Sequence, residues 1–141
     1  MHCVVEGRYM CIEETEVSLD SGHNKSLGAK GESAAAKYLE AKGYNIVDRN
    51  WKCKMGEIDI VAMDNGTIVF VEVKTRANLE KGLPEDSVGP KKRKKYECLA
   101  AMYLQDHDYV DMPVRFDVVG ILVMSKNRAF MRHHYNAFGV G

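Results

Sequence analysis

The sequence predicts an α/β protein, because two helical segments alternate with five shorter strand-like runs. Residues 27–42 and 90–105 repeat their apolar side chains with the period of a helix. The other runs are rich in β-branched and aromatic residues and are separated by turn-forming residues. The predicted order is α-β-β-β-α-β-β, with no internal repeat or low-complexity segment.

The chain starts with a weakly periodic segment, residues 1–25, which is expected to be a poorly ordered acidic extension of a single domain, residues 26–141. The first helix should end at Gly43, because glycine favours the backbone conformation that closes a helix. A β-strand is expected from Tyr44 to about Trp51. The helix face that should be buried carries Leu27, Gly31, Ala34, Ala35, Tyr38 and Leu39.

The clearest local pattern is a β-hairpin formed by residues 57–64 and 67–75. Asn65-Gly66 separates the two runs, and this dipeptide between apolar runs is the strongest short-range signal for a two-residue turn. A two-residue turn pairs Asp64 with Thr67 and so fixes the register of the whole hairpin.

A polar loop over residues 77–89 separates the hairpin from the second helix, which Pro90 should start. Two further β-strands are expected over 114–124 and 128–135, joined by a turn. The apolar stripe of the second helix consists of Tyr96, Leu99, Ala100, Tyr103 and Leu104.

Length and composition fit a soluble protein of one domain. The chain has 141 residues with no apolar run long enough to span a bilayer, and its start does not read as a secretory signal. Four cysteines show no metal-type spacing, so they are expected to be reduced thiols in a cytoplasmic protein without a membrane partner.

The formal net charge is zero, but the charge is unevenly distributed. Residues 1–22 carry five acids and one base, whereas residues 23–141 carry 19 bases and 15 acids, a net charge of +4. Five consecutive cations run from Lys91 through Lys92, Arg93 and Lys94 to Lys95. Such a run is most often a solvated helix face, and the sharper interpretation is a patch that binds nucleic-acid phosphates. Within it, Lys92 and Arg93 are expected to lie above the apolar stripe of the second helix, and Lys91, Lys94 and Lys95 to face outward.

The predicted register gathers charge at the open end of the hairpin. Asp59 lies opposite Glu72, Glu57 lies opposite Lys74, and alternation places all four on one face. Directly opposed residues have Cβ atoms roughly 4.5–5.5 Å apart, so both carboxylates can reach one ion. Mg²⁺ or Mn²⁺ would remove their repulsion and stabilise charge developing on a phosphate. The alternative is a cluster of solvated charges on an exposed sheet face.

A series of segments over about residues 27–138 forms a recognisable pattern: Gly31-Glu32 to Tyr38-Leu39, Lys42-Gly43-Tyr44, Arg49-Asn50-Trp51, Gly56 to Val61, Phe70 to Arg76, Pro90-Lys91-Lys92, Arg115 to Val119 and Asn136-Ala137-Phe138. Within it, Asp59 is followed after twelve residues by Glu72-Val73-Lys74, which looks like the signature of the PD-(D/E)xK nuclease superfamily. In their order along the chain, the segments resemble the YraN-like family of predicted endonucleases.

The resemblance implies a restriction-endonuclease-like fold, with a central mixed β-sheet flanked by helices. It implies an endonuclease that hydrolyses DNA with Mg²⁺ or Mn²⁺ bound by Asp59 and Glu72, with Lys74 as charge stabiliser. Glu32 takes the place of a helical glutamate in archaeal-type Holliday junction resolvases, which implies an accessory metal ligand. By analogy with those enzymes, branched DNA and a homodimer are expectations. The alternative is a non-catalytic nucleic-acid-binding or interaction module that keeps the fold.

Three further residues have simpler interpretations. Arg76 lies on the same strand face as Lys74 and either binds a phosphate or is an edge charge. Asp117 is expected to pair with Arg115 or orient a neighbour, a structural role. His133 and His134 point to opposite faces of a strand and so cannot form a paired metal site by themselves.

Overall fold

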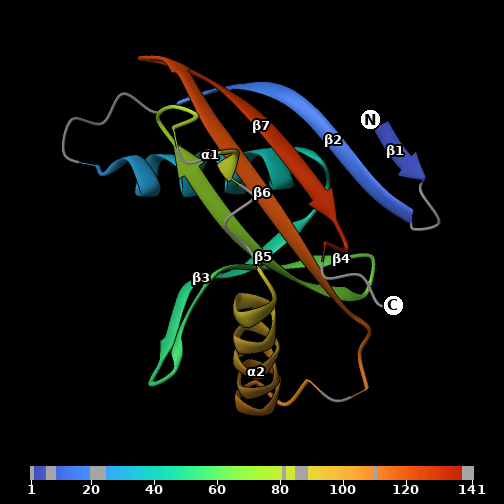
Figure 1. Ribbon diagram of the computed structural model, residues 1–141. Coiled ribbons are helices and arrows are strands. Elements are labelled where there is room, and N and C mark those ends of the chain that lie inside the picture. The colour runs from blue at the N-terminus through green and yellow to red at the C-terminus, as the bar shows by residue number, and fades with distance from the viewer. Residues whose placement is uncertain are drawn as a thin grey trace.

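The computed structural model describes residues 2–5, 9–19, 25–80, 82–84, 89–109 and 111–137. Within these ranges seven strands form one sheet in the order β1-β2-β7-β6-β5-β4-β3, with helices α1 and α2 beside it (Figure 1). No helix of the described part is long and apolar enough to cross a membrane. The elements are β1 His2–Val5, β2 Tyr9–Ser18, α1 Leu27–Ala41, β3 Asn45–Cys53, β4 Gly56–Asp64, β5 Thr67–Arg76, α2 Pro90–Asp106, β6 Val114–Ser125 and β7 Arg128–Tyr135.

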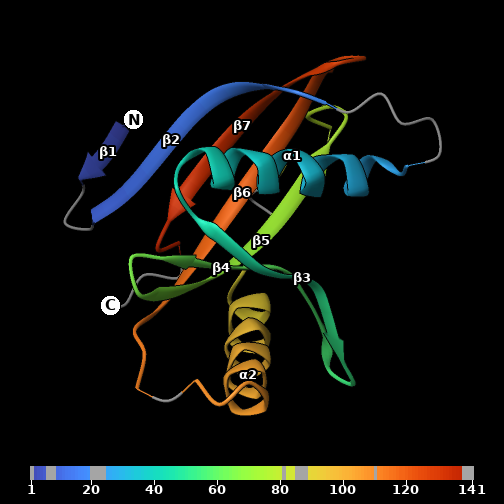
Figure 2. The same cartoon turned by 180° about the vertical axis from the view of Figure 1, so that it is seen from behind.

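The two helices cover opposite faces of the sheet. Along β4 and β5, Ile60 and Val71 pack with α1, while their neighbours Val61 and Phe70 pack with α2. This alternation is what a strand between two layers requires. Seen from behind, α1 crosses in front of β5, β6 and β7, and α2 lies at the β3–β4 end (Figure 2). The apolar stripe predicted for α2 is confirmed, with Leu104 at its partly buried margin.

The sheet is mixed. β5 and β6 run parallel and every other neighbouring pair is antiparallel. A parallel pair needs a crossover, and the chain between β5 and β6 contains α2. The α/β class is therefore confirmed, and the architecture is consistent with a restriction-endonuclease-like fold.

The predicted hairpin is confirmed, including its two-residue turn. Asp64 pairs with Thr67, and Asn65 and Gly66 both have positive φ, as a two-residue turn of this hand requires. The register places Val61 opposite Phe70.

The predicted element order is wrong at its start, because β1 and β2 precede α1. β2 pairs with β7 along Cys11–Ser18 and so extends the sheet, whereas the sequence predicted no strand there. Glu13 of β2 faces inward, and a charged residue at an inward position breaks the alternation of apolar and polar residues that predicts a strand. Glu13 accepts hydrogen bonds from Tyr38 and Tyr135 and forms an ion pair with Lys42. The rest of the expected extension (1, 6–8 and 20–24), part of the 77–89 loop and Phe138 lie outside the described residues. The division between extension and domain stays a prediction.

Helix α1 packs closely on β5 through Gly31. A Cβ built on Gly31 would lie 2.0 Å from Thr75 Oγ1 and 3.1 Å from Thr75 Cβ. We expect Gly31→Ala to reduce the free energy of unfolding by about 1–3 kcal/mol, since the helix must shift away from the strand. Urea denaturation measures this. Gly28→Ala is the control, because the same helix leaves open space there; equal stability of the two variants would contradict the close contact.

Candidate functional site

β4 and β5 separate at the point where the carboxylates begin. Their ladder ends at the pair Ile60 and Val71. Beyond it, β4 stays paired with β3 and β5 stays paired with β6, where Glu72 lies beside Val118. Asp59 and Glu72 are thus the first residues after the fork, instead of a hydrogen-bonded pair of the ladder.

The Asp59 carboxylate bridges the fork. It is 8% exposed, and its Oδ2 accepts a hydrogen bond of 2.9 Å from the backbone N–H of Val73. A buried backbone donor needs a partner, and at this point the neighbouring strand no longer supplies one. The bond therefore fixes the Asp59 side chain beside Glu72.

Glu72 is held in an environment that favours its protonated form. Burial raises the pKa of Glu72 to about 8, and a hydrogen bond with Asp59 and the Asp59 charge add to this rise. The charges of Lys74 and Lys92 oppose it. A positive charge close to a carboxyl group favours its charged form, so a cation bound beside Glu72 would oppose this rise in its pKa.

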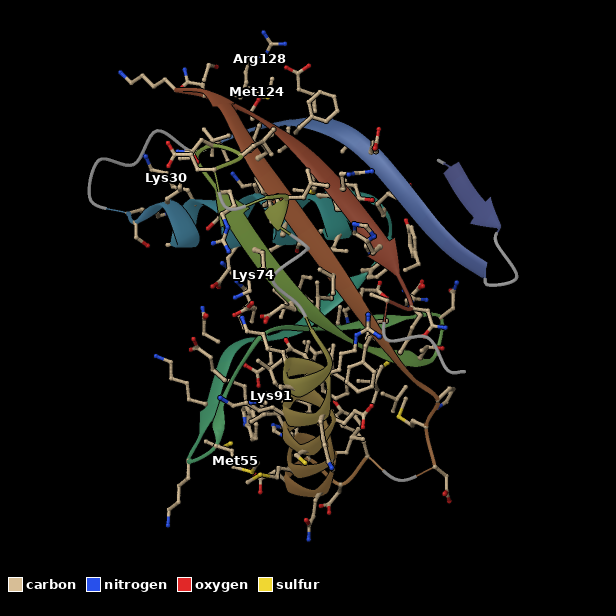
Figure 3. The ribbon with its side chains drawn as sticks, viewed as in Figure 1. Lys30, Met55, Lys74, Lys91, Met124 and Arg128 are labelled. Carbon is tan, nitrogen blue, oxygen red and sulfur yellow. The ribbon has the colours of Figure 1, made fainter. Side chains whose placement is uncertain are left out.

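A cavity of about 540 Å³ opens over the fork. It lies between the β3–β4 hairpin and α2, and Figure 3 shows Lys74 on β5, Lys91 at the start of α2 and Met55 at the hairpin turn beside that helix. Its charged lining comprises Lys52, Glu57, Asp59, Glu72, Lys74, Lys92 and Lys95.

Glu32 lies in an adjoining cavity. That cavity is lined by residues of α1 and β3 that include Ser33, Arg49 and Asn50, and it shares Lys52 with the cavity over the fork. Burial and the charge of Asp59 raise the pKa of Glu32, whereas a hydrogen bond with Asn50 and the charge of Arg49 lower it. The structure therefore places Glu32 within electrostatic range of Asp59 but beside the central cavity.

The donor set fits a divalent cation held by few protein ligands. Among the described residues no group of three or more His, Cys, Asp and Glu side chains is gathered closely enough to hold an ion. Asp59 and Glu72 form a pair, and Mg²⁺ is usually held by one or two carboxylates together with waters and phosphate oxygens. These two side chains would hold the ion.

The free energy of unfolding should depend on pH through the protonation of Glu72. A folded-state pKa above the unfolded value means that the folded protein holds this proton more tightly, so raising the pH from about 4.5 to 8 favours unfolding. In metal-free buffer we expect Glu72→Gln to lose less stability over this range than wild type, by at most about 1.4 kcal/mol per pH unit.

Urea denaturation at pH 5 and pH 8 with EDTA measures the difference. Mn²⁺ at pH 8 should then stabilise wild type and leave Glu72→Gln unchanged. Glu57→Gln is the control, because Glu57 is an exposed carboxylate of the same cavity. A Glu57→Gln variant that loses the pH effect, beside a Glu72→Gln variant that keeps it, would contradict the assignment.

The cationic run of α2 divides into two sets. Lys92 and Lys95 line the cavity of the carboxylates, whereas Lys91, Lys94 and again Lys95 line a neighbouring cavity with Met55 and Cys98. Lys91, Lys94 and Lys95 are exposed, as expected, and the Lys95 side chain also lies close to Gly56 of the hairpin. Arg76 is half-buried at the end of β5.

Sequence reasoning did not place Lys52 or Tyr96 at the site. It placed Lys92 above the apolar stripe of the second helix, four residues before Tyr96 and seven before Leu99, as a nucleic-acid-binding residue, but it did not join Lys92 to the carboxylates. The Tyr96 hydroxyl donates to the Val71 carbonyl over 3.1 Å and fixes α2 at the fork. Nothing in the sequence pattern of Lys52 distinguishes it from a solvated strand residue.

The comparisons with known proteins agree with one another. Residues 31–121 match the uncharacterised protein family UPF0102. A UPF0102 protein of Geobacter sulfurreducens is 45% identical over 118 residues, which is 84% of this chain and 92% of the relative. The one from Geotalea uraniireducens is 46% identical over 121 residues, 86% and 95% of the two chains. The one from Chlorobaculum parvum is 45% identical over 108 residues, 77% and 84%. These names state no activity.

Proposed function

The chain belongs to the UPF0102 family, the YraN family that its motifs resemble, and from its site we propose that it is an Mg²⁺- or Mn²⁺-dependent endonuclease acting on DNA. The observation that carries the proposal is the pair of carboxyl groups at the fork of β4 and β5, Asp59 buried and Glu72 partly buried. They line one cavity together with Lys52, Lys74, Lys92 and Lys95. Neither a plain sheet nor a helix contact needs this arrangement.

Each residue has a role in the proposal. Asp59 and Glu72 hold the cation, and Asp59 is fixed for this by the N–H of Val73. The cation, when bound, offsets the carboxylate charges and stabilises charge that builds up on the phosphate. Lys74 places an ammonium group in the same cavity and stabilises the same phosphate charge. Glu32 acts from the adjoining cavity as an accessory ligand or as a group that orients water.

A second candidate function is nucleic-acid binding without catalysis. It is favoured by one observation: Lys91 and Lys94 line a neighbouring cavity whose lining, among the residues that the structure describes, contains no carboxylate. Such a module would contact the phosphate backbone without reading sequence. Its affinity would fall steeply with salt, and it would not require Asp59 or Glu72.

Cleavage assays separate the two functions. Purified full-length protein is incubated with linear duplex, single-stranded and branched DNA, each with Mn²⁺, Mg²⁺ or EDTA. We expect cleavage of at least one DNA form with either metal and none with EDTA. Salt-sensitive binding to all forms, with every form left intact, would reject the nuclease in favour of the binding module.

A further inference from the structure

Lys74 and Lys92 place two ammonium groups in the cavity that also holds the carboxylates. Lys74 lies on β5, Lys92 lies in the first turn of α2, and both line the cavity. The proximity of Lys74, together with burial, lowers the pKa of Lys92. Two ammonium groups in one cavity repel each other, and an anion between or beside them removes that repulsion.

Arg76 adds a third cation next to Lys74. It follows Lys74 by two residues and so lies on the same face of β5, and its charge also acts on Lys92. Its Nε is buried and has no hydrogen-bond partner among the described residues. A buried N–H donor without an acceptor is uncommon in folded proteins, so this N–H is available to an acceptor oxygen of a ligand.

Glu72 is the carboxylate whose charge acts most directly on Lys92. In the proposed function a bound cation neutralises Glu72, which leaves the lysines and Arg76 without compensation. The backbone that carries these groups is fixed, because β5 lies inside the sheet and the Tyr96 hydroxyl holds α2 to Val71. The backbone positions from which the three cations extend are therefore fixed relative to one another.

We propose that Lys74, Arg76 and Lys92 form a phosphate-binding pocket that holds a phosphate group of the substrate beside the two carboxylates. A phosphate has several strong acceptor oxygens, so it can accept from both ammonium groups and from the Arg76 Nε–H at once. The pocket deepens the proposed nuclease function by assigning Lys92 to the site. The phosphate is either an internal phosphodiester of the nucleic acid or a terminal phosphate monoester.

Inorganic phosphate is the first probe, and it tests the pocket without any cleavage. Wild type, Lys92→Met and Lys91→Met are titrated in EDTA at constant ionic strength while NMR follows the Arg76 Nε–H signal. Lys91 is the matched control, because it neighbours Lys92 on the helix and lines the other cavity. We expect Lys92→Met to weaken binding about tenfold or more, and Lys91→Met by less than about twofold.

Two oligonucleotides of the same sequence, with and without a 5′-phosphate, identify the source of the phosphate. Preference for the phosphorylated oligonucleotide that disappears in Lys92→Met assigns a terminal phosphate. Equal binding of both, weakened by Lys92→Met more than by Lys91→Met, assigns an internal phosphodiester. Equal weakening by the two variants, or an Arg76 signal that phosphate does not shift, would overturn the pocket. Since none of these binding measurements requires catalysis, they can reject the phosphate pocket without rejecting the nuclease function. Likewise, the cleavage assays can reject the nuclease function without rejecting the pocket.

Discussion

Glu72→Gln should lower metal-dependent DNA cleavage by at least about 10²–10³-fold while the protein stays folded. Glutamine keeps the size of the side chain and can still hydrogen-bond to Asp59, but it cannot offer a negative charge to a cation. Burial already favours an uncharged group at this position, because it raises the pKa of Glu72 to about 8. The substitution therefore removes a cation ligand without opening a cavity.

Single-turnover cleavage with saturating protein measures the effect, so that changes in DNA affinity do not contribute. Glu57→Gln should cleave at the wild-type rate within about threefold, because the exposed Glu57 carboxylate is not at the fork. Anisotropy with labelled DNA in EDTA should give wild-type affinity for Glu72→Gln. Cleavage by Glu72→Gln at the wild-type rate would show that the carboxylate pair is not the cation site.

Asp117→Asn should reduce the free energy of unfolding by about 3–5 kcal/mol. Asp117 is 1% exposed and accepts four hydrogen bonds, from Arg115 Nε and Nη2, His133 Nε2 and the Asn136 backbone N–H, at 2.8–3.0 Å. Burial alone would raise the pKa of Asp117, but the bonds from His133 and Arg115 hold it below its ordinary value. An asparagine turns one acceptor into a donor and leaves Arg115 without its buried charge partner.

Asp64→Asn is the matched control for this prediction. Asp64 contacts the same guanidinium at 3.2 Å, but its side chain is 26% exposed, so its replacement should cost no more than about 1 kcal/mol. Urea denaturation of both variants gives the comparison. A Asp117→Asn variant as stable as Asp64→Asn would show that the buried cluster contributes little. Because the cluster lies on the α1 side of the sheet, this result would not bear on cleavage.

The hairpin and the closeness of Asp59 to Glu72 could be predicted because both follow from residues that are near one another along the chain. Asn65-Gly66 fixes the turn, the turn fixes the register, and the register places Asp59 near Glu72. The separation of β4 from β5 cannot be predicted from the sequence, since it depends on β4 staying paired with β3 while β5 stays paired with β6. Glu57 and Lys74, which were predicted to lie opposite each other, are therefore not paired in the ladder. Both residues line the cavity instead.

The N-terminal strand was missed for a different physical reason. Glu13 faces the α1 side of the sheet and accepts hydrogen bonds from Tyr38, Lys42 and Tyr135. These partners are distant in sequence, so no local pattern shows that a charge there is compatible with a strand. Lys92 is similar: its position above the apolar stripe of α2 is local, but its place in one cavity with Lys74 and the carboxylates depends on how α2 packs against the sheet.

Cleavage of DNA by matched preparations of wild type and Asp59→Asn tests the central claim most directly. Both proteins are expressed and purified identically and incubated at pH 8 with Mn²⁺ and the DNA form that the panel identifies. We predict cleavage by wild type that EDTA abolishes, and at least about 10²-fold less by Asp59→Asn. Equal cleavage by the two preparations, or none by wild type on any DNA form, would contradict a metal-dependent nuclease at the fork of β4 and β5.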